Sequence, residues 1–121
     1  MVLNVRLDGD LAVLSNFGRM MNDPRYVDAA ADVRELLDRG VRNFVIELAG
    51  IRETGKSLLA ILMTITRDVR KAGGEVVIAH PSREIEGHLA MMQMEDYWDV
   101  FPTVVDAAEF FGRPRLSRRK G

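Results

Sequence analysis

Two short, almost entirely apolar runs, separated by one long amphipathic segment, constrain the fold of this chain more than any other feature. The runs cover residues 44–48 and 75–79, and apolar runs of this length are typical of strands buried on both faces of a sheet. Between them, apolar residues recur at the spacing of one helix face: they are Leu58, Leu62, Ile65, Val69 and Ala72. A strand, a helix and a strand in this order predict two parallel strands joined by a crossover helix.

The segments on either side extend this pattern. Apolar and polar residues alternate over residues 3–7, Asp8-Gly9-Asp10 is typical of a turn, and residues 11–14 are apolar. Together these segments predict a β-hairpin. A first helix follows Pro24 and ends at Gly40, and the second ends at Gly73-Gly74. Further elements are predicted as follows: a helix capped by Ser82 and packed through Ile85, Leu89 and Met92, a brief strand at Val100-Phe101, and a last helix opened by Thr103 and Asp106. The order β-β-α-β-α-β-α-β-α predicts an α/β fold, with a mixed sheet of one antiparallel hairpin and parallel strands, covered by about four helices.

Length and charge narrow the function classes. The 121 residues suffice for one domain, which we expect over residues 1–112. Residues 113–121 hold five bases and no acid, and we expect a basic, disordered tail there. The remaining body holds 12 bases and 18 acids, which argues against a nucleic-acid-binding face on it. Without cysteine, a signal sequence or a long apolar run, we expect a cytoplasmic protein that does not bind a membrane and has no metal site.

Four motifs, in the right order and at nearly the right spacing, resemble one known family. They are the order of elements itself, Val45-Ile46-Glu47-Leu48-Ala49-Gly50-Ile51, Ala72-Gly73-Gly74-Glu75-Val76-Val77-Ile78, and Val100-Phe101-Pro102-Thr103-Val104-Val105-Asp106-Ala107-Ala108. The chain is similar, from about Leu3 to Phe111, to STAS domains, the fold of the bacterial anti-sigma factor antagonists. This resemblance implies a non-enzymatic module that binds an anti-sigma factor or a serine kinase-like regulator in transcription or stress signalling.

The loop before the second helix departs from the family pattern. In anti-sigma factor antagonists this loop typically reads Asp-Ser-Ser-Gly, and its first serine is phosphorylated by a kinase that is itself the anti-sigma factor. Alignment without gaps places Lys56 on that serine and Ser57 on the second one. Ser57, or Thr54 with a shifted loop, is then the candidate phosphoacceptor, whereas Ser57 could instead cap the helix. The resemblance also implies a partner-binding surface at the loop and helix start: Arg52, Glu53, Gly55, Lys56 and Leu58.

A competing motif occupies the same loop. Residues 50–57 fit the phosphate-binding pattern G-x-x-x-x-G-K-[ST], between a predicted strand and a predicted helix. The alternative function is therefore nucleotide or anion binding through Gly50, Gly55, Lys56 and Ser57. Against hydrolysis, the next strand ends at His80 where a Mg²⁺-binding acid is needed, and Glu53 would repel phosphate.

Other polar residues offer no catalytic constellation. His80 stands at a strand end without a second imidazole or a paired carboxylate nearby, so we interpret it as a loop residue. Met91, Met92 and Met94 predict an apolar cluster with core packing as its default role, and binding through a methionine-rich surface as the alternative. No cofactor and no catalytic residue is expected. The sequence leaves open whether the chain forms a monomer or a dimer, and whether it is a scaffold subunit of a larger signalling assembly.

Overall fold

The structure is a computed structural model that describes residues 3–20, 27–52 and 55–112. Its elements follow in this order: β1 (Asn4–Asp8), β2 (Leu11–Ser15), the short 3-10 helix η1 (Phe17–Met20), α1 (Val27–Asp38), β3 (Asn43–Glu47), α2 (Lys56–Lys71), β4 (Glu75–Ala79), α3 (Arg83–Met91), β5 (Val100–Phe101) and α4 (Val104–Phe110). The predicted order of strands and α-helices is confirmed, and η1 is an addition to it.

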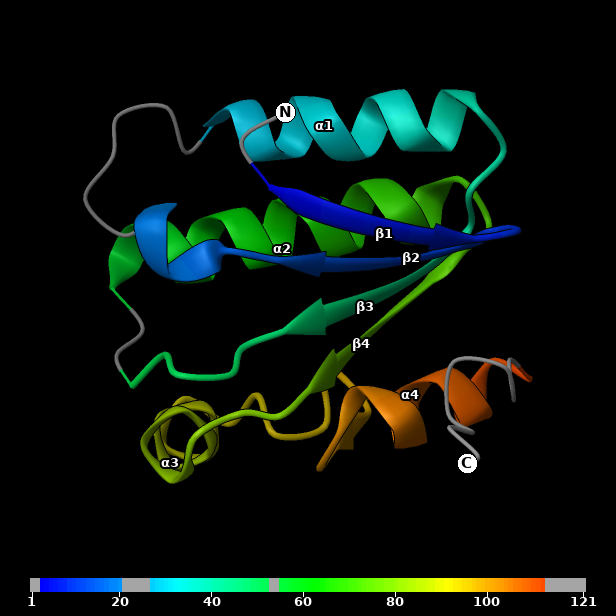
Figure 1. Cartoon of the computed structure of the whole chain (residues 1–121). Coiled ribbons are helices and arrows are strands. Elements are labelled where there is room, and N and C mark those ends of the chain that lie inside the picture. Colours follow the sequence, from blue (N-terminus) through cyan, green and yellow to red (C-terminus); the bar gives the residue numbers. More distant parts are fainter. Residues whose placement is uncertain (1–2, 21–26, 53–54, 113–121) are drawn as a thin grey trace.

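The strands form one five-stranded sheet in the order β1-β2-β3-β4-β5 (Figure 1). β1 and β2 are antiparallel, with Asn4 opposite Ser15 and Asp8 opposite Leu11. Every other neighbouring pair is parallel. The mixed sheet predicted from the sequence is confirmed, and sequential neighbours along the chain are also neighbours in space.

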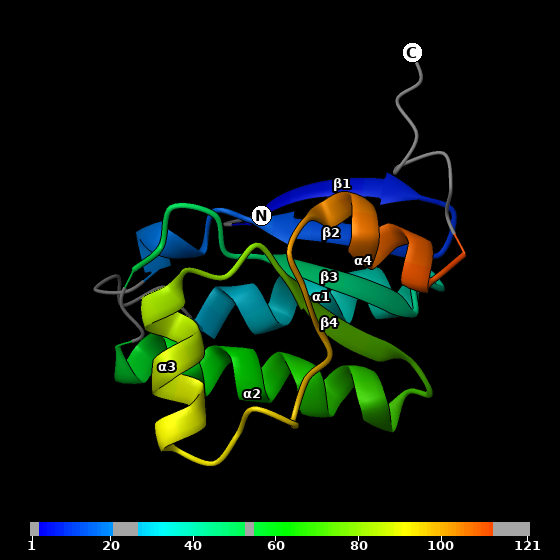
Figure 2. The same ribbon diagram turned by 90° about the horizontal axis from the view of Figure 1, so that it is seen from below.

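The sheet separates two apolar clusters. α1 and α2 cover one face, and α4 lies on the other (Figures 1 and 2). The larger cluster joins the helix-facing residues of the strands, such as Phe44 and Ile46, to buried residues of α1 and α2. The smaller one joins Val45 and Val77 to Ala107 of α4. Because β3 and β4 are buried on both faces, their apolar runs need no alternation with polar residues.

The helix ends follow the predicted signals. Gly40, with φ +97°, ends α1, because its N–H donates to Leu37 O (3.0 Å) and the next N–H, of Val41, donates to Leu36 O (3.0 Å). At the starts of α3 and α4, Ser82 Oγ accepts from Ile85 N and Thr103 Oγ1 accepts from Asp106 N, both at 3.1 Å. The predicted caps at Ser82 and Thr103 are therefore confirmed.

The methionines after α3 depart from expectation. Met94 packs against the larger core cluster, but Met91 is 84% exposed and Met92 is 39% exposed. Met91 is two positions after the buried Leu89 and so lies on the opposite side of α3, and Met92 is the C-cap, beyond the last helical residue. The expected core packing is therefore wrong for these two residues. The predicted tail at 113–121 lies outside the described residues.

Candidate functional site

The loop between β3 and α2 begins with a tight turn held by the core. Leu48 donates its N–H to Ala79 O of β4 (3.0 Å), and Ile51 N donates back to Leu48 O (3.1 Å). Gly50, at φ +80°, occupies the position of this four-residue turn that requires a left-handed backbone. The Ile51 side chain is only 8% exposed and lies beside Gly18 of η1. The first half of the loop is thus anchored, and the Arg52 side chain that follows it is exposed.

The start of α2 presents one cation to solvent. Gly55 is the N-cap and contributes no side-chain cap, Lys56 is the first helical residue and is exposed, and Ser57 is half-buried. Ser57 is therefore the second helical residue, and the alternative in which it caps the helix is wrong. Leu58 is fully buried, so we remove it from the expected partner-contacting surface and assign it to the support beneath. Glu53 and Thr54 lie outside the described residues.

The different positions of two serines lead to a first prediction. Ser82→Ala removes a cap hydrogen bond and is expected to lower the free energy of unfolding by about 1 kcal/mol. Ser57→Ala, in the first turn of α2 but not at its cap, is expected to change it by less than about 0.5 kcal/mol. Urea unfolding of the two variants beside the wild type measures both values, and equal losses would contradict the assignment of the caps.

The same geometry bears on the phosphate-binding alternative. Gly50, Gly55, Lys56 and Ser57 do lie between a strand and a helix, as that motif requires. However, the N–H of Ile51 is already bonded within the turn, and its side chain is committed to the core. Ligand sites of open α/β sheets lie where the strand order reverses, whereas this order runs without reversal from β1 to β5. The structure therefore gives no support to nucleotide or anion binding at this loop.

Past Lys56, the solvent-facing side of α2 is only partly polar. Lys56, Ala60 and Arg67 are exposed, and Leu59 and Met63 are partly buried against the core cluster. The sequence reasoning pointed to the helix beside the loop but did not assign Leu59, Ala60, Met63 and Arg67 to a partner-binding surface. Their signal was the recurrence of positions 56, 59, 60, 63 and 67 at helical spacing, away from the buried stripe of the same helix.

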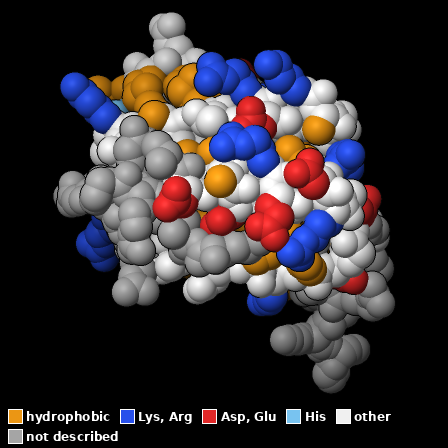
Figure 3. Space-filling model, turned by 90° about the horizontal axis from the view of Figure 1, so that it is seen from above, with side chains coloured by type: hydrophobic (Ala, Val, Ile, Leu, Met, Phe, Trp, Pro, Cys, Tyr) orange, Lys and Arg blue, Asp and Glu red, His pale blue; other side chains and the backbone are white. Residues whose placement is uncertain are grey.

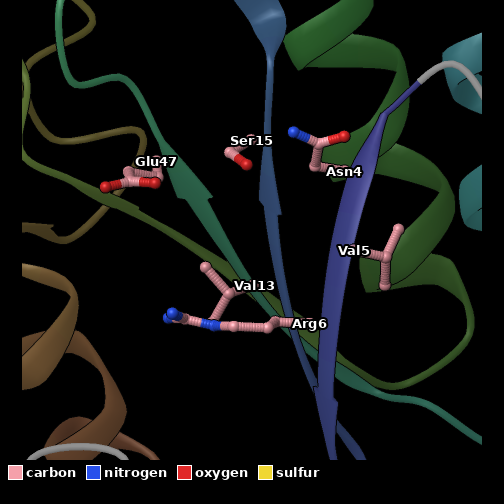
Figure 4. A pocket seen from close by; sticks show the side chains of 6 residues that line it. All are labelled: Asn4, Val5, Arg6, Val13, Ser15 and Glu47. Carbon is pink, nitrogen blue, oxygen red and sulfur yellow. The ribbon is translucent and has the colours of Figure 1, made fainter.

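A hollow lies on the face of the sheet that α4 covers, beside β1, β2 and β3. A volume of about 130 Å³ is lined by Asn4, Val5, Arg6, Val13, Ser15 and Glu47 (Figure 4). Ser15 and Glu47 also line an adjoining hollow of about 270 Å³, which reaches Gly50 and Ile51. The two hollows share one hydroxyl and one carboxylate at the ends of β2 and β3, and the smaller one also includes the Arg6 guanidinium from the middle of β1. Glu47 is the one acid in the apolar run of residues 44–48.

The remaining candidates are isolated. His80 is exposed, has φ +58° and donates its backbone N–H to Phe101 O (2.9 Å), as a strand-end loop residue does. Among the described residues, no group of three or more His, Asp or Glu side chains is placed to hold a metal ion. No described helix is long and apolar enough to cross a membrane.

Comparison with known proteins identifies the same architecture elsewhere. Residues 23–107 match the sequence profile of the STAS domain. A candidate anti-sigma factor antagonist of Thermotoga maritima superposes with a TM-score of 0.77 at 16% identity, over 92% of this chain and 95% of that one. An anti-sigma factor antagonist (STAS) domain protein of Planctomyces limnophilus gives 0.74 at 16% identity, over 91% and 97%. No curated protein is similar enough in sequence to count as a relative.

A third solved structure is the Bacillus cell fate determinant SpoIIAA in its phosphorylated form. It superposes with a TM-score of 0.69 at 11% identity, over 90% of this chain and 98% of that one. At such identities the three structures establish a shared fold and no more. Each superposition covers at least 90% of this chain and at least 95% of the other one, so the match is to a whole architecture.

Proposed function

The chain belongs to the STAS domain family, and on that premise we propose that it acts as an anti-sigma factor antagonist. In this proposal it is a non-enzymatic module that binds an anti-sigma factor or serine kinase-like regulator in bacterial transcription or stress signalling. Its place of action is the cytoplasm, where such regulators meet the transcription machinery. Proteins described as antagonists of this kind are among those that share its fold.

The observation that carries the proposal is the surface at the β3–α2 loop and the start of α2. Ile51 and Leu58 are buried and anchor this segment, while Arg52 and Lys56 beside them are exposed. The surface continues onto Leu59 and Met63, whose apolar side chains are only partly covered. A rigid support with exposed charge and partly exposed apolar groups is what a protein-binding surface requires.

The regulation of this surface depends on its hydroxyl groups. Lys56 stands at the family's phosphoacceptor position and cannot accept a phosphate on oxygen. Ser57 is half-buried in the first turn of α2, where the helix dipole and free N–H groups would favour a phosphate. We propose that docking does not require phosphorylation, and that Ser57, or Thr54 in the adjoining loop, is the residue modified if the partner is a kinase.

Affinity capture tests the proposal. The tagged full-length chain is incubated with lysate of its source organism, and the retained proteins are identified by mass spectrometry. We expect an anti-sigma factor or a serine kinase-like regulator, which the purified chain then binds directly in calorimetry. Incubation of the purified pair with ATP and Mg²⁺ shows by intact mass whether Ser57 or Thr54 gains a phosphate. Recovery of no such regulator in repeated captures would overturn the proposed function.

A further inference from the structure

The exposed side of α2 carries cations that form no ion pair within the described residues. Lys56, Arg67 and Lys71 are exposed and make no ion pair with any described residue. The one acid of this helix, Asp68, is paired with Arg34 of α1 at 3.2 Å. The positive charge of this helix surface is therefore not neutralised within the described part of the chain.

A fourth cation of the same helix is already engaged elsewhere. Arg70 contacts Glu75 at 2.9 Å, donates to Tyr97 O at 2.8 Å and lies 4.9 Å from the centre of the Tyr97 ring. Its role in holding α2 against the β4 side of the fold separates it from Lys56 and Arg67. The free charge of the helix is thus confined to its solvent-facing side.

This local charge opposes the net charge of the body, residues 1–112. Outside residues 113–121, the chain holds 12 bases and 18 acids. A basic surface on an acidic body directs an approaching molecule to one place, because an acidic partner is attracted there and repelled elsewhere. The same imbalance disfavours a nucleic acid, whose backbone would meet repulsion beyond the narrow basic surface.

The cations enclose an apolar centre. Ala60 is exposed, and Leu59 and Met63 are partly exposed, between Lys56 at one end and Arg67 about three turns away. Figure 3 shows hydrophobic side chains gathered over the N-terminal half of α2, with Lys and Arg side chains on both sides of them. An apolar centre within a charged rim is the usual anatomy of a specific protein interface.

We propose that this surface, Lys56, Leu59, Ala60, Met63 and Arg67, docks an acidic surface of the partner protein, with carboxylates at both ends of an apolar contact. The inference rests on the proposed function and specifies its partner. The ungapped alignment places Lys56 where the family resemblance implies a phosphorylated serine, so a cation stands at this position instead of a hydroxyl whose charge changes on phosphorylation. Attraction to a carboxylate surface is then constant and does not depend on a phosphate.

Charge reversal in the capture experiment tests this inference. Three tagged chains are compared in the same lysate: wild type, the double variant Lys56→Glu/Arg67→Glu, and Arg6→Glu. Arg6 is exposed on the sheet face opposite α2, so its reversal changes net charge without touching the surface. We expect the double variant to capture at least about tenfold less regulator than the wild type, because like charges opposed across an interface are strongly unfavourable. The Arg6 variant should capture as much regulator as the wild type.

The outcomes separate the two proposals. Equal capture by all three chains leaves the antagonist function standing and overturns the acidic-surface inference. Failure of the wild type to capture any regulator overturns both, and nuclease-sensitive capture of nucleic acid through this surface also overturns the inference. Binding of the purified regulator is then measured at two salt concentrations, and we expect it to weaken several-fold between about 50 and 300 mM. Circular dichroism and thermal unfolding check that the variants are folded.

Discussion

Replacing Trp98 with alanine is expected to lower the free energy of unfolding by about 4 kcal/mol, because the indole fills the junction between α2 and the segment after α3. Trp98 is 2% exposed and belongs to the larger core cluster. Its ring packs edge-on against the Tyr97 ring, with 4.6 Å between the ring centroids. Its Nε1–H donates to Thr66 Oγ1 at 2.8 Å, and Thr66 in turn donates to Leu62 O at 2.7 Å. Urea unfolding measures the loss, and a value below about 1.5 kcal/mol would contradict this packing.

A pair of smaller changes separates the packing of the ring from its hydrogen bond. Thr66→Val leaves the indole N–H buried without an acceptor and is expected to cost about 1–3 kcal/mol. In a Trp98→Phe background the same Thr66→Val change should cost less, because no donor is left unpaired there. The difference between the two costs of Thr66→Val is the coupling free energy between Thr66 and Trp98. A coupling near zero would show that the hydrogen bond does not contribute.

The second large effect is expected at Gly74, where Gly74→Ala should lower the free energy of unfolding by about 3 kcal/mol or more. A Cβ built there would lie 2.0 Å from Arg42 O and 2.9 Å from Val69 Cγ1. Arg42 O, just before β3, accepts the N–H of Glu75 at the start of β4 (2.9 Å). To make room for the added Cβ, the backbones of β3 and β4 would have to separate at this end. Urea unfolding measures this loss. Amide hydrogen exchange is also compared between the variant and the wild type, and the protection of the β3 and β4 amides is expected to fall in the variant.

A second glycine supplies the matched control. Gly87 lies within α3, and nothing stands within 4 Å of a Cβ added there. Gly87→Ala is therefore expected to raise the free energy of unfolding by about 0.5–1 kcal/mol through helix propensity. If both alanine variants were destabilised alike, the close approach at Gly74 would not be the cause. Opposite signs at the two sites are the expected result.

The candidate surface was only partly predictable. Lys56 and Arg52 were expected at a partner-binding loop, and both side chains are exposed. Leu58, expected beside them, is buried. Ser57 lies inside the helix instead of capping it, because the N-cap is Gly55, two residues earlier. A helix boundary can shift by one or two residues without any change in the apolar periodicity, yet each such shift changes which side chain caps the helix.

The sequence alone determined the order of elements, the double-sided burial of β3 and β4 and the helix ends at Gly40 and Gly73. These features rest on local patterns, namely the period of apolar residues and the backbone freedom of glycine, which act within one element or one turn. Local patterns also carried the family resemblance, because the motifs are themselves strand ends and helix ends.

Only the tertiary structure decided which side chains remain on the surface. Met91 and Trp98 stand seven positions apart in one apolar and aromatic stretch, yet one is 84% exposed and the other 2%. Likewise, the cations of α2 differ in their ion pairing. Arg70 contacts Glu75 and the Tyr97 ring, whereas Lys56 and Arg67 form no ion pair with a described residue. Burial and ion pairing depend on what distant segments bring to a residue, and such contacts leave no periodic signal in the chain itself.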